Sequence, residues 1–301
     1  MKNKLFKLNY IQKEKIAGYS FLSPNLLGFL IFSLIPIIAS VFLTFTSWNL
    51  ASSPKFVGFE NFANVLKDEL FWTYLWNTIY YAIGTIPLTV ILAFSLAYLL
   101  NRKIRGVVFF RTLQFLPSVT LLVAIAIVWS WLYNADFGLF NYFLGKIGIT
   151  GPRWLQSKEW AMPAIIIMGI WKGTGYSMLI FLAGLQGIPE RYYEAAEIDG
   201  ANWWHKIVHI TIPLISPTTF FVIVTTTIGS IQGFDQFYIM TRGGPSGATT
   251  TLVYYIFQNA FEWFKMGYAA TVAMMLFIIV LILTLIQWHF SNKWVFDEGV
   301  E

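Results

Sequence analysis

The chain has 301 residues, of which 57% are hydrophobic and 12% are charged. Soluble domains carry about 25% charged residues, so this composition excludes an ordinary soluble domain and indicates a surface that faces lipid. The chain has no cysteine, which excludes disulfides, thiolate catalysis and cysteine-ligated metals. Its net charge of +5 is better explained by the loops of a membrane protein than by nucleic-acid binding.

Six stretches are apolar enough to cross a bilayer as helices, which takes about 20 residues each. They cover residues of about 21–47, 75–100, 110–133, 161–185, 214–237 and 268–289. The first is not a cleavable signal peptide, because its apolar run from Phe21 to Thr46 exceeds a signal core of about 7–15 residues. We therefore predict an all-α membrane protein with six transmembrane helices and one domain over residues 1–301.

The distribution of Lys and Arg predicts the orientation. Cytoplasmic segments of membrane proteins are enriched in these residues. Most basic residues fall inside if the N-terminus is cytoplasmic, notably Lys2, Lys4, Lys7, Lys13, Lys15, Arg102, Lys103, Arg105 and Arg111. Both termini and the loop 186–212 are then expected in the cytoplasm.

The loop 186–212 has the pattern of a short helix between two spans. Pro189 is a typical first residue, and Glu190 places an acid in the first turn, where the helix dipole favours it. Gly200 is suited to end the helix, and Pro213 and Pro217 mark the return to the bilayer. A helix this short, with nothing of its own to bury, needs a partner to pack against.

The same loop carries a resemblance to a known family. The runs EAAEIDGA (194–201) and ITIPLISP (210–217) resemble the EAA loop of binding-protein-dependent ABC importer permeases. Further runs resemble the maltose-type sugar permeases of that family: FVGFENF (56–62), Asn77-Thr78, WKGTGYSMLIFLAGLQGIP (171–189), GFDQFYIMTRGGP (233–245) and GYAATVAMMLF (267–277). The resemblance spans nearly the whole chain in the right order.

The resemblance implies an ABC type I importer transmembrane domain in a bacterial plasma membrane. The loop helix would be the coupling helix that docks in a cleft of an ATPase, as opposed to an ordinary amphipathic loop helix. Its residues would be Glu194, Ala195, Ala196, Asp199 and Gly200, with Glu194 engaging a basic residue of the cleft. The implied partners are a second homologous permease, two ATPase subunits and an extracytoplasmic sugar-binding protein. ATP and Mg would be bound by the ATPase, and no cofactor by this chain.

Three stretches resemble those that line the sugar cavity of maltose-type permeases. They contribute eight candidate substrate residues: Gln114, Ser118, Lys172, Gly173, Tyr176, Ser230, Gly233 and Phe234. Gln and Ser side chains bond sugar hydroxyls, aromatic rings stack on pyranose faces, and glycine lets a sugar approach the backbone. The alternative is helix packing, because small and hydroxyl residues also hold membrane helices together.

Apart from Arg111 at the cytoplasmic edge of the third, two charges fall inside the predicted spans, Lys172 near the middle of the fourth and Asp235 toward the outer end of the fifth. A lone charge at the bilayer centre costs about 2.5–3.5 kcal/mol on insertion scales, so Lys172 needs a partner. We expect that partner to be Asp235, and the alternative is the carboxylate of an acidic sugar.

Other chemistries have little support in the sequence. No P-loop is present, and His205 and His209 lack the glutamate that would follow the first histidine of a zinc-protease motif. No GxSxG motif occurs. The remaining alternatives are a stand-alone secondary transporter or channel, which usually has inverted repeats and more spans, and a membrane-embedded enzyme, which requires clustered polar residues within its spans.

Overall fold

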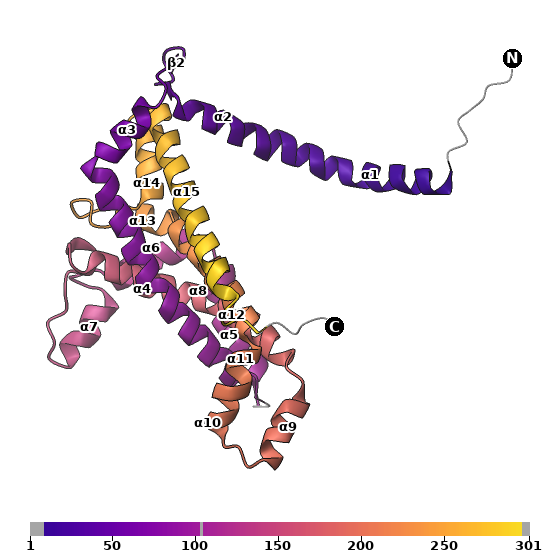
Figure 1. Cartoon of the computed structure of the whole chain (residues 1–301). Coiled ribbons are helices and arrows are strands. Elements are labelled where there is room, and N and C mark those ends of the chain that lie inside the picture. The colour runs from indigo at the N-terminus through magenta and orange to yellow at the C-terminus, as the bar shows by residue number, and fades with distance from the viewer. Residues whose placement is uncertain (1–8, 103–104, 297–301) are drawn as a thin grey trace. The chain divides into compact units, whose positions relative to one another are not determined.

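The structure is a computed structural model that describes residues 9–102 and 105–296, and it is built almost entirely of helices (Figure 1). Contacts divide the chain into two compact units. One comprises the residues up to Leu66 together with Asn259–Met274, and the other comprises Lys67–Gln258 together with the residues from Met275 onward. The single domain expected over residues 1–301 stays a prediction. Lys2, Lys4, Lys7 and Lys103, which support the predicted orientation, lie outside the described residues.

The first unit begins with a continuous helical stretch from Tyr10 to Thr44. It consists of α1 (Tyr10–Phe29), the π-helix η1 (Leu30–Leu34) and α2 (Ile35–Thr44). The wide turn of η1 directly precedes Pro36, which has no N–H to donate to the carbonyl of Phe32. Local π adjustments are one way in which membrane helices accommodate proline.

A short two-stranded sheet with a buried polar contact follows α2 in the same unit. The strands β1 (Thr46–Ser47) and β2 (Lys55–Phe56) pair antiparallel, and α3 (Glu60–Lys67) begins soon after. The buried Asn61 amide donates to the carbonyl oxygens of Thr44 and Thr46, each at 2.9 Å. The Asn61 side chain thus satisfies the end of the first apolar helix, where the backbone would otherwise lack partners.

The second unit holds most of the helices. In chain order they are α4 (Glu69–Leu100), α5 (Val107–Val119), α6 (Leu122–Leu132), α7 (Leu139–Lys146), η2 (Trp154–Gln156), α8 (Ala161–Gln186), α9 (Glu190–Ile198), α10 (Trp203–Lys206), η3 (Ile207–Thr211), α11 (Ile212–Leu214), α12 (Ser216–Ile231), α13 (Asp235–Met240) and α14 (Leu252–Phe257). The π-helix η4 (Gln258–Glu262) and α15 (Met266–Ser291) run from one unit into the other.

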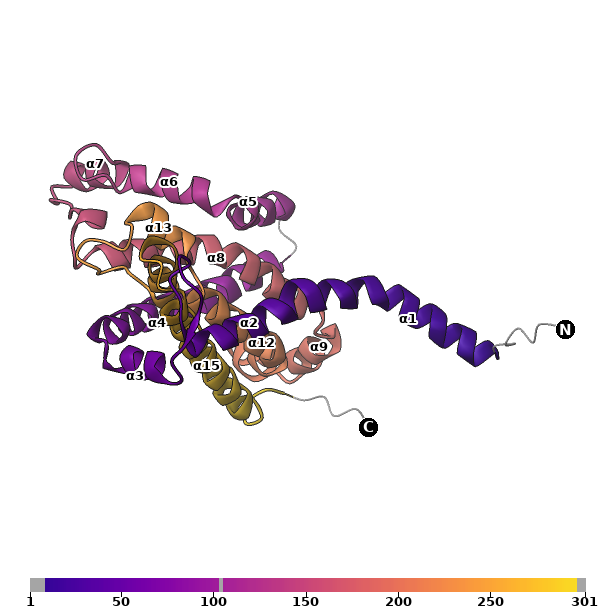
Figure 2. The same ribbon diagram turned by 90° about the horizontal axis from the view of Figure 1, so that it is seen from above.

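Helix α8 is the centre of the second unit. It packs most extensively against α4 and also against α5, and Figure 2 shows it between these two helices. Glycines allow the close approach: a side chain at Gly84 would collide with Ile166, and one at Gly169 would collide with the Tyr81 hydroxyl. Small residues at a helix interface are the usual means of close packing in membranes.

The six expected spans correspond to four continuous helices and two bent helix pairs, if each bent pair is counted as one span. Four continuous helices are long and apolar enough to cross a membrane: Tyr10–Thr44, Glu69–Leu100, Ala161–Gln186 and Met266–Ser291. Two bent pairs account for the third and fifth stretches, Val107–Val119 with Leu122–Leu132 at 98°, and Trp203–Leu214 with Ser216–Ile231 at 64°. The six-helix fold class is confirmed, but the third span is broken, because Thr120 and Leu121 adopt extended backbone.

Candidate substrate cavity and cytoplasmic helix

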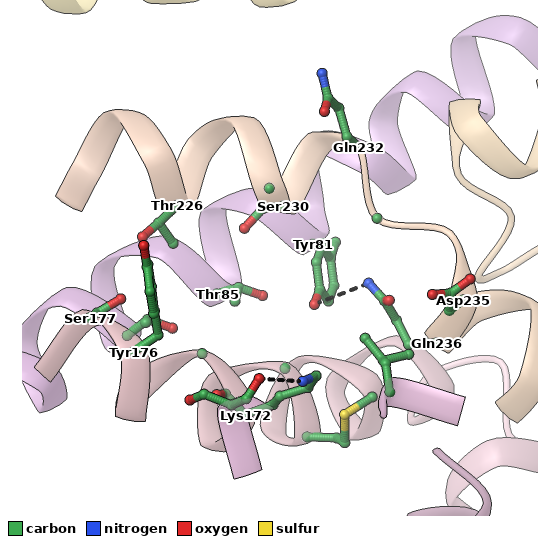
Figure 3. Close-up of a pocket in the computed structure, with 18 of the residues that line it drawn as sticks. Tyr81, Thr85, Lys172, Tyr176, Ser177, Thr226, Ser230, Gln232, Asp235 and Gln236 are labelled. Carbon is green, nitrogen blue, oxygen red and sulfur yellow. Dashed lines mark hydrogen bonds between the residues drawn. The ribbon is translucent and has the colours of Figure 1, made fainter. Parts of the chain in front are cut away.

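A cavity of about 480 Å³ lies in the second unit among α4, α8, α12 and the start of α13, with α5–α6 closing one side (Figure 3). Its lining is unusually polar for an apolar bundle. The polar lining residues are Tyr81, Thr85, Thr89, Ser118, Lys172, Tyr176, Ser177, Thr225, Thr226, Ser230, Gln232, Asp235 and Gln236. In a membrane protein, polar side chains within the spans are costly unless they face a cavity or a partner.

Seven of the eight candidate substrate residues line this cavity. They come from three elements: Ser118 from α5, Lys172, Gly173 and Tyr176 from α8, and Ser230, Gly233 and Phe234 from α12 and the turn after it. The exception is Gln114, which is not part of the lining. It lies one turn before Ser118 on α5, where its carbonyl oxygen packs against Gly175 of α8. Whether the seven bind substrate stays a prediction.

The largest omission from the sequence prediction is the wall formed by α4. Tyr81, Thr85 and Thr89 recur every four residues and therefore share one face of that helix. Figure 3 shows Tyr81 and Gln236 pointing toward one another, and the Gln236 amide lies 3.5 Å from the Tyr81 hydroxyl. The spacing of polar residues every four positions in an otherwise apolar helix could have predicted this wall from the sequence.

Two hydroxyls on this wall lack hydrogen-bond partners. Thr85 is 4% exposed and Thr89 is 1% exposed, and no protein group bonds either hydroxyl oxygen. The Tyr81 hydroxyl is close to Thr85, but the pair does not meet hydrogen-bond geometry. A threonine in a helix usually bonds the carbonyl four residues earlier, as Thr174 does with Ile170 at 2.6 Å. Buried hydroxyls that forgo this bond retain capacity for water or a ligand.

Lys172 does not form the expected ion pair with Asp235, although both line the cavity. Its ammonium instead lies 3.2 Å from the carbonyl oxygen of Pro117, 3.4 Å from that of Ser118 and 3.2 Å from that of Thr120. An ion pair does form elsewhere in the second unit, between Lys206 and Glu197. The expected pairing is therefore wrong, because the broken third span offers carbonyls at the level of Lys172.

The loop 186–212 contains the expected short helix. Helix α9 starts after Pro189 and ends at Ile198, with Asp199 at its C-cap and Gly200 at a φ of +77°. Glu194 and Ala195 are exposed, and Ile198 is 87% exposed. Figure 1 shows α9 and α10 beyond the end of α4.

Two contacts tie α9 to the entry of the fifth span. The Lys206 ammonium lies 3.2 Å from the Glu197 carboxylate, and the Tyr193 hydroxyl lies 3.0 Å from that of Thr211. Burial raises the pKa of the Tyr193 phenol above its ordinary value of 10.0. The phenol therefore keeps its proton, and this hydrogen bond, throughout the physiological pH range.

The described residues contain no group of three or more His, Cys, Asp or Glu able to hold a metal ion. His205 and His209 stack with ring centroids 5.7 Å apart, and the Nδ1 atom of His205 lies 2.9 Å from the Asn202 side-chain oxygen. Apart from Lys172 and Asp235, the polar groups of the cavity lining are neutral hydroxyls and amides.

Comparison with known proteins decides the family. A family model described as "Binding-protein-dependent transport system inner membrane component" matches residues 86–295. The chain belongs to this family. It is a multi-pass membrane protein of the permease type, and the family is one of transport components.

Individual relatives match over nearly the whole length of this permease. The probable ABC transporter permease protein YesP of Bacillus subtilis is 40% identical over 98% of this chain and 96% of its own. The lactose transport system permease protein LacF of Rhizobium radiobacter is 36% identical over 92% and 95%. A solved bacterial alginate ABC transporter, in complex with an alginate-bound periplasmic protein, matches with a TM-score of 0.84 at 24% identity over 97% and 98%. That likeness concerns the fold.

Proposed function

We propose that this permease is the transmembrane subunit of an ATP-driven importer that takes up a sugar or oligosaccharide from an extracytoplasmic binding protein. The cavity carries the proposal. Hydroxyl and amide groups from five helices surround it, together with Tyr81, Tyr176 and Phe234, and these groups suit the hydroxyls and apolar faces of a saccharide. Relatives named for lactose, arabinooligosaccharide and trehalose/maltose transport support this substrate class.

The proposed assembly contains a second homologous permease and two ATPase subunits in a bacterial plasma membrane. Both termini of this chain would be cytoplasmic, and α9 would dock in the ATPase. Glu194, Ala195, Ala196, Asp199 and Gly200 would form the contact. ATP and Mg would bind to the ATPase, so ATP hydrolysis would act on the cavity through α9 and the contacts that tie α9 to α10 and η3.

The competing function is a stand-alone secondary transporter or channel. In many secondary transporters, half-helix carbonyl ends coordinate a coupling ion near the bilayer midplane. Here the carbonyls at the break of the third span are bonded by Lys172. An exposed cytoplasmic helix also has no use in a stand-alone carrier, whereas a docking surface for an ATPase requires one.

The test begins with the cognate binding protein. It is screened by thermal shift against neutral and acidic mono- and oligosaccharides, and the best ligand is used for uptake into proteoliposomes that contain the whole transporter. We expect uptake that requires both Mg-ATP and the binding protein. Uptake by this chain alone, driven by an ion gradient and indifferent to ATP, would contradict the proposal.

A further inference from the structure

The third span is interrupted within the membrane-spanning part of the second unit. Helix α5 ends at Val119, Thr120 and Leu121 are extended, and α6 starts at Leu122 after a turn of 98°. The last four carbonyls of any helix lack intrahelical N–H partners. In a bilayer, lipid does not supply those partners, so the surrounding protein or a water-filled cavity must.

Lys172 supplies them from the neighbouring helix. Its ammonium lies 3.2–3.4 Å from the carbonyl oxygens of Pro117, Ser118 and Thr120. An ammonium has three N–H donors, so these three acceptors account for all of them. The C-terminal end of α5 also carries partial negative charge, which favours a cation at this place.

The contact is reciprocal. The Ser118 hydroxyl donates to the carbonyl oxygen of Lys172 at 3.0 Å, so each residue bonds the other's backbone. Ser118 and Lys172 both line the cavity. The bond therefore fixes one wall of the cavity to another.

The glycines around Lys172 make this geometry accessible. A side chain at Gly175 would collide with the carbonyl oxygen of Gln114 and would come within 2.8 Å of the Ser118 hydroxyl. The absence of that side chain lets α5 lie against α8, within reach of the Lys172 side chain. In the run Lys172-Gly-Thr-Gly175, Gly175 thus allows the close helix contact and Lys172 forms the hydrogen bonds across it.

We propose that Lys172 is a positioning residue, which caps the broken third span and sets the shape of the cavity wall, and that it is not a substrate contact. With its three donors engaged, Lys172 has no free N–H for a sugar carboxylate. Lys172 is the one basic residue in the described lining, and the other charged residue, Asp235, is an acid. The lining therefore offers a sugar carboxylate no cation with a free N–H. This inference goes beyond the proposed function and does not depend on which molecule is transported.

The absence of cysteine from the chain provides a clean test. Leu122→Cys places a single thiol at the break, where Leu122 lines the cavity. Its labelling rate with a membrane-impermeant maleimide is measured in the assembled transporter in membranes, with no sugar added. The rate is compared in otherwise unchanged protein and in variants that also carry Lys172→Met, Lys172→Arg or Asp235→Asn.

We expect Lys172→Met to raise the labelling rate about tenfold, because losing charge-assisted hydrogen bonds increases local opening of the break. Lys172→Arg should restore most of the original rate, and Asp235→Asn should leave it unchanged. If Lys172→Met does not accumulate in the membrane while Asp235→Asn does, the capping role is also supported, because a substrate contact is not needed for folding.

Two results would overturn the proposal. An unchanged labelling rate in Lys172→Met would show that the ammonium does not hold the break. An effect of Asp235→Asn as large as that of Lys172→Met would show that the two charges act as an ion pair. Because sugar is absent, neither result bears on the substrate class proposed above.

Discussion

At the scale of single residues, the hydroxyls of Thr85 and Thr89 indicate that this face of α4 binds a ligand and does not serve helix packing alone. Both side chains are buried, both line the cavity and neither hydroxyl has a protein partner. An unsatisfied buried hydroxyl costs about 1–3 kcal/mol, so packing alone does not account for it. A saccharide hydroxyl, or a water that a saccharide displaces, would satisfy it during transport.

We therefore predict that Thr89→Val, which keeps the shape and removes the hydroxyl, will preserve or raise thermal stability while lowering uptake. The loss of one hydrogen bond of about 1 kcal/mol should raise the apparent KM about fivefold. The measurements are the Tm of the purified permease complex and the KM of uptake in proteoliposomes.

Thr284→Val is the matched control, because the Thr284 hydroxyl bonds the Val280 carbonyl at 2.8 Å and Thr284 does not line the cavity. We expect its KM to stay at the wild-type value. A lower Tm in Thr89→Val with an unchanged KM would assign the Thr89 hydroxyl to packing.

Two neighbouring glycines on α8 give a second prediction at this scale. A methyl group at Gly175 would collide with the backbone carbonyl of Gln114, whereas one at Gly173 would meet only Thr89 at an ordinary 3.6 Å. Alanine gains about 1 kcal/mol in helix propensity at either position, so the difference between the variants reports the collision.

We expect Gly175→Ala to lower the stability of the permease by about 1–3 kcal/mol through overpacking, and Gly173→Ala to leave it unchanged or slightly higher. Thermal unfolding in detergent, followed for both variants under the same conditions, is the measurement. Equal Tm values for the two variants would mean that α5 does not lie as close to α8 as the structure places it.

Helix α9 is the element on which the proposed coupling to the ATPase would depend. It is joined to η3 by Tyr193 with Thr211 and to α10 by Glu197 with Lys206, and it leads into the fifth span, which lines the cavity. Both contacts lie on one side of α9, while Glu194, Ala195 and Ile198 are exposed. A force applied to the exposed side would therefore pass directly to the start of α12.

We predict that Glu194→Lys abolishes ATP-driven uptake without affecting membrane insertion. The added cation would repel the basic residue expected in the ATPase cleft and weaken docking. Uptake and co-purification of the ATPase are measured together with the amount of permease in the membrane.

Glu159→Lys makes the same charge change on a fully exposed residue of another loop and serves as the control. Its uptake should match the wild type. Uptake near the wild-type level in Glu194→Lys would show that Glu194 is not part of the surface that contacts the ATPase.

The prediction at the scale of the whole molecule concerns assembly. The helices of this chain bound the cavity on some sides only. We expect six spans to enclose half of the transport pathway, and a second permease to enclose the other half. We predict that coexpression with its neighbouring permease and ATPase genes yields a complex with one copy of each permease and two ATPase subunits. Native mass spectrometry gives the stoichiometry. A transport-competent protein purified from this gene alone would contradict it.

The sequence by itself determined the six apolar segments and the short helix after Pro189. These features follow from local rules: apolar length sets membrane spans, and proline and glycine mark helix ends. The resemblance to known permeases supplied the family and seven of the lining residues. The four-residue spacing of Tyr81, Thr85 and Thr89 was also readable, although its importance was missed.

Only the tertiary structure decided where the third span breaks and which group donates hydrogen bonds to the carbonyl oxygens at the break. The apolar run from 110 to 133 reads as one helix, because nothing local reveals the extended backbone at Thr120 and Leu121. The partner of Lys172 was equally hidden, since carbonyl oxygens occur at every residue and only packing exposes three of them at Lys172. The close approach of α5 to α8, where the Gln114 carbonyl lies against Gly175, was likewise hidden. Backbone acceptors and helix contacts belong to the assembled bundle, so the residue types alone do not determine them.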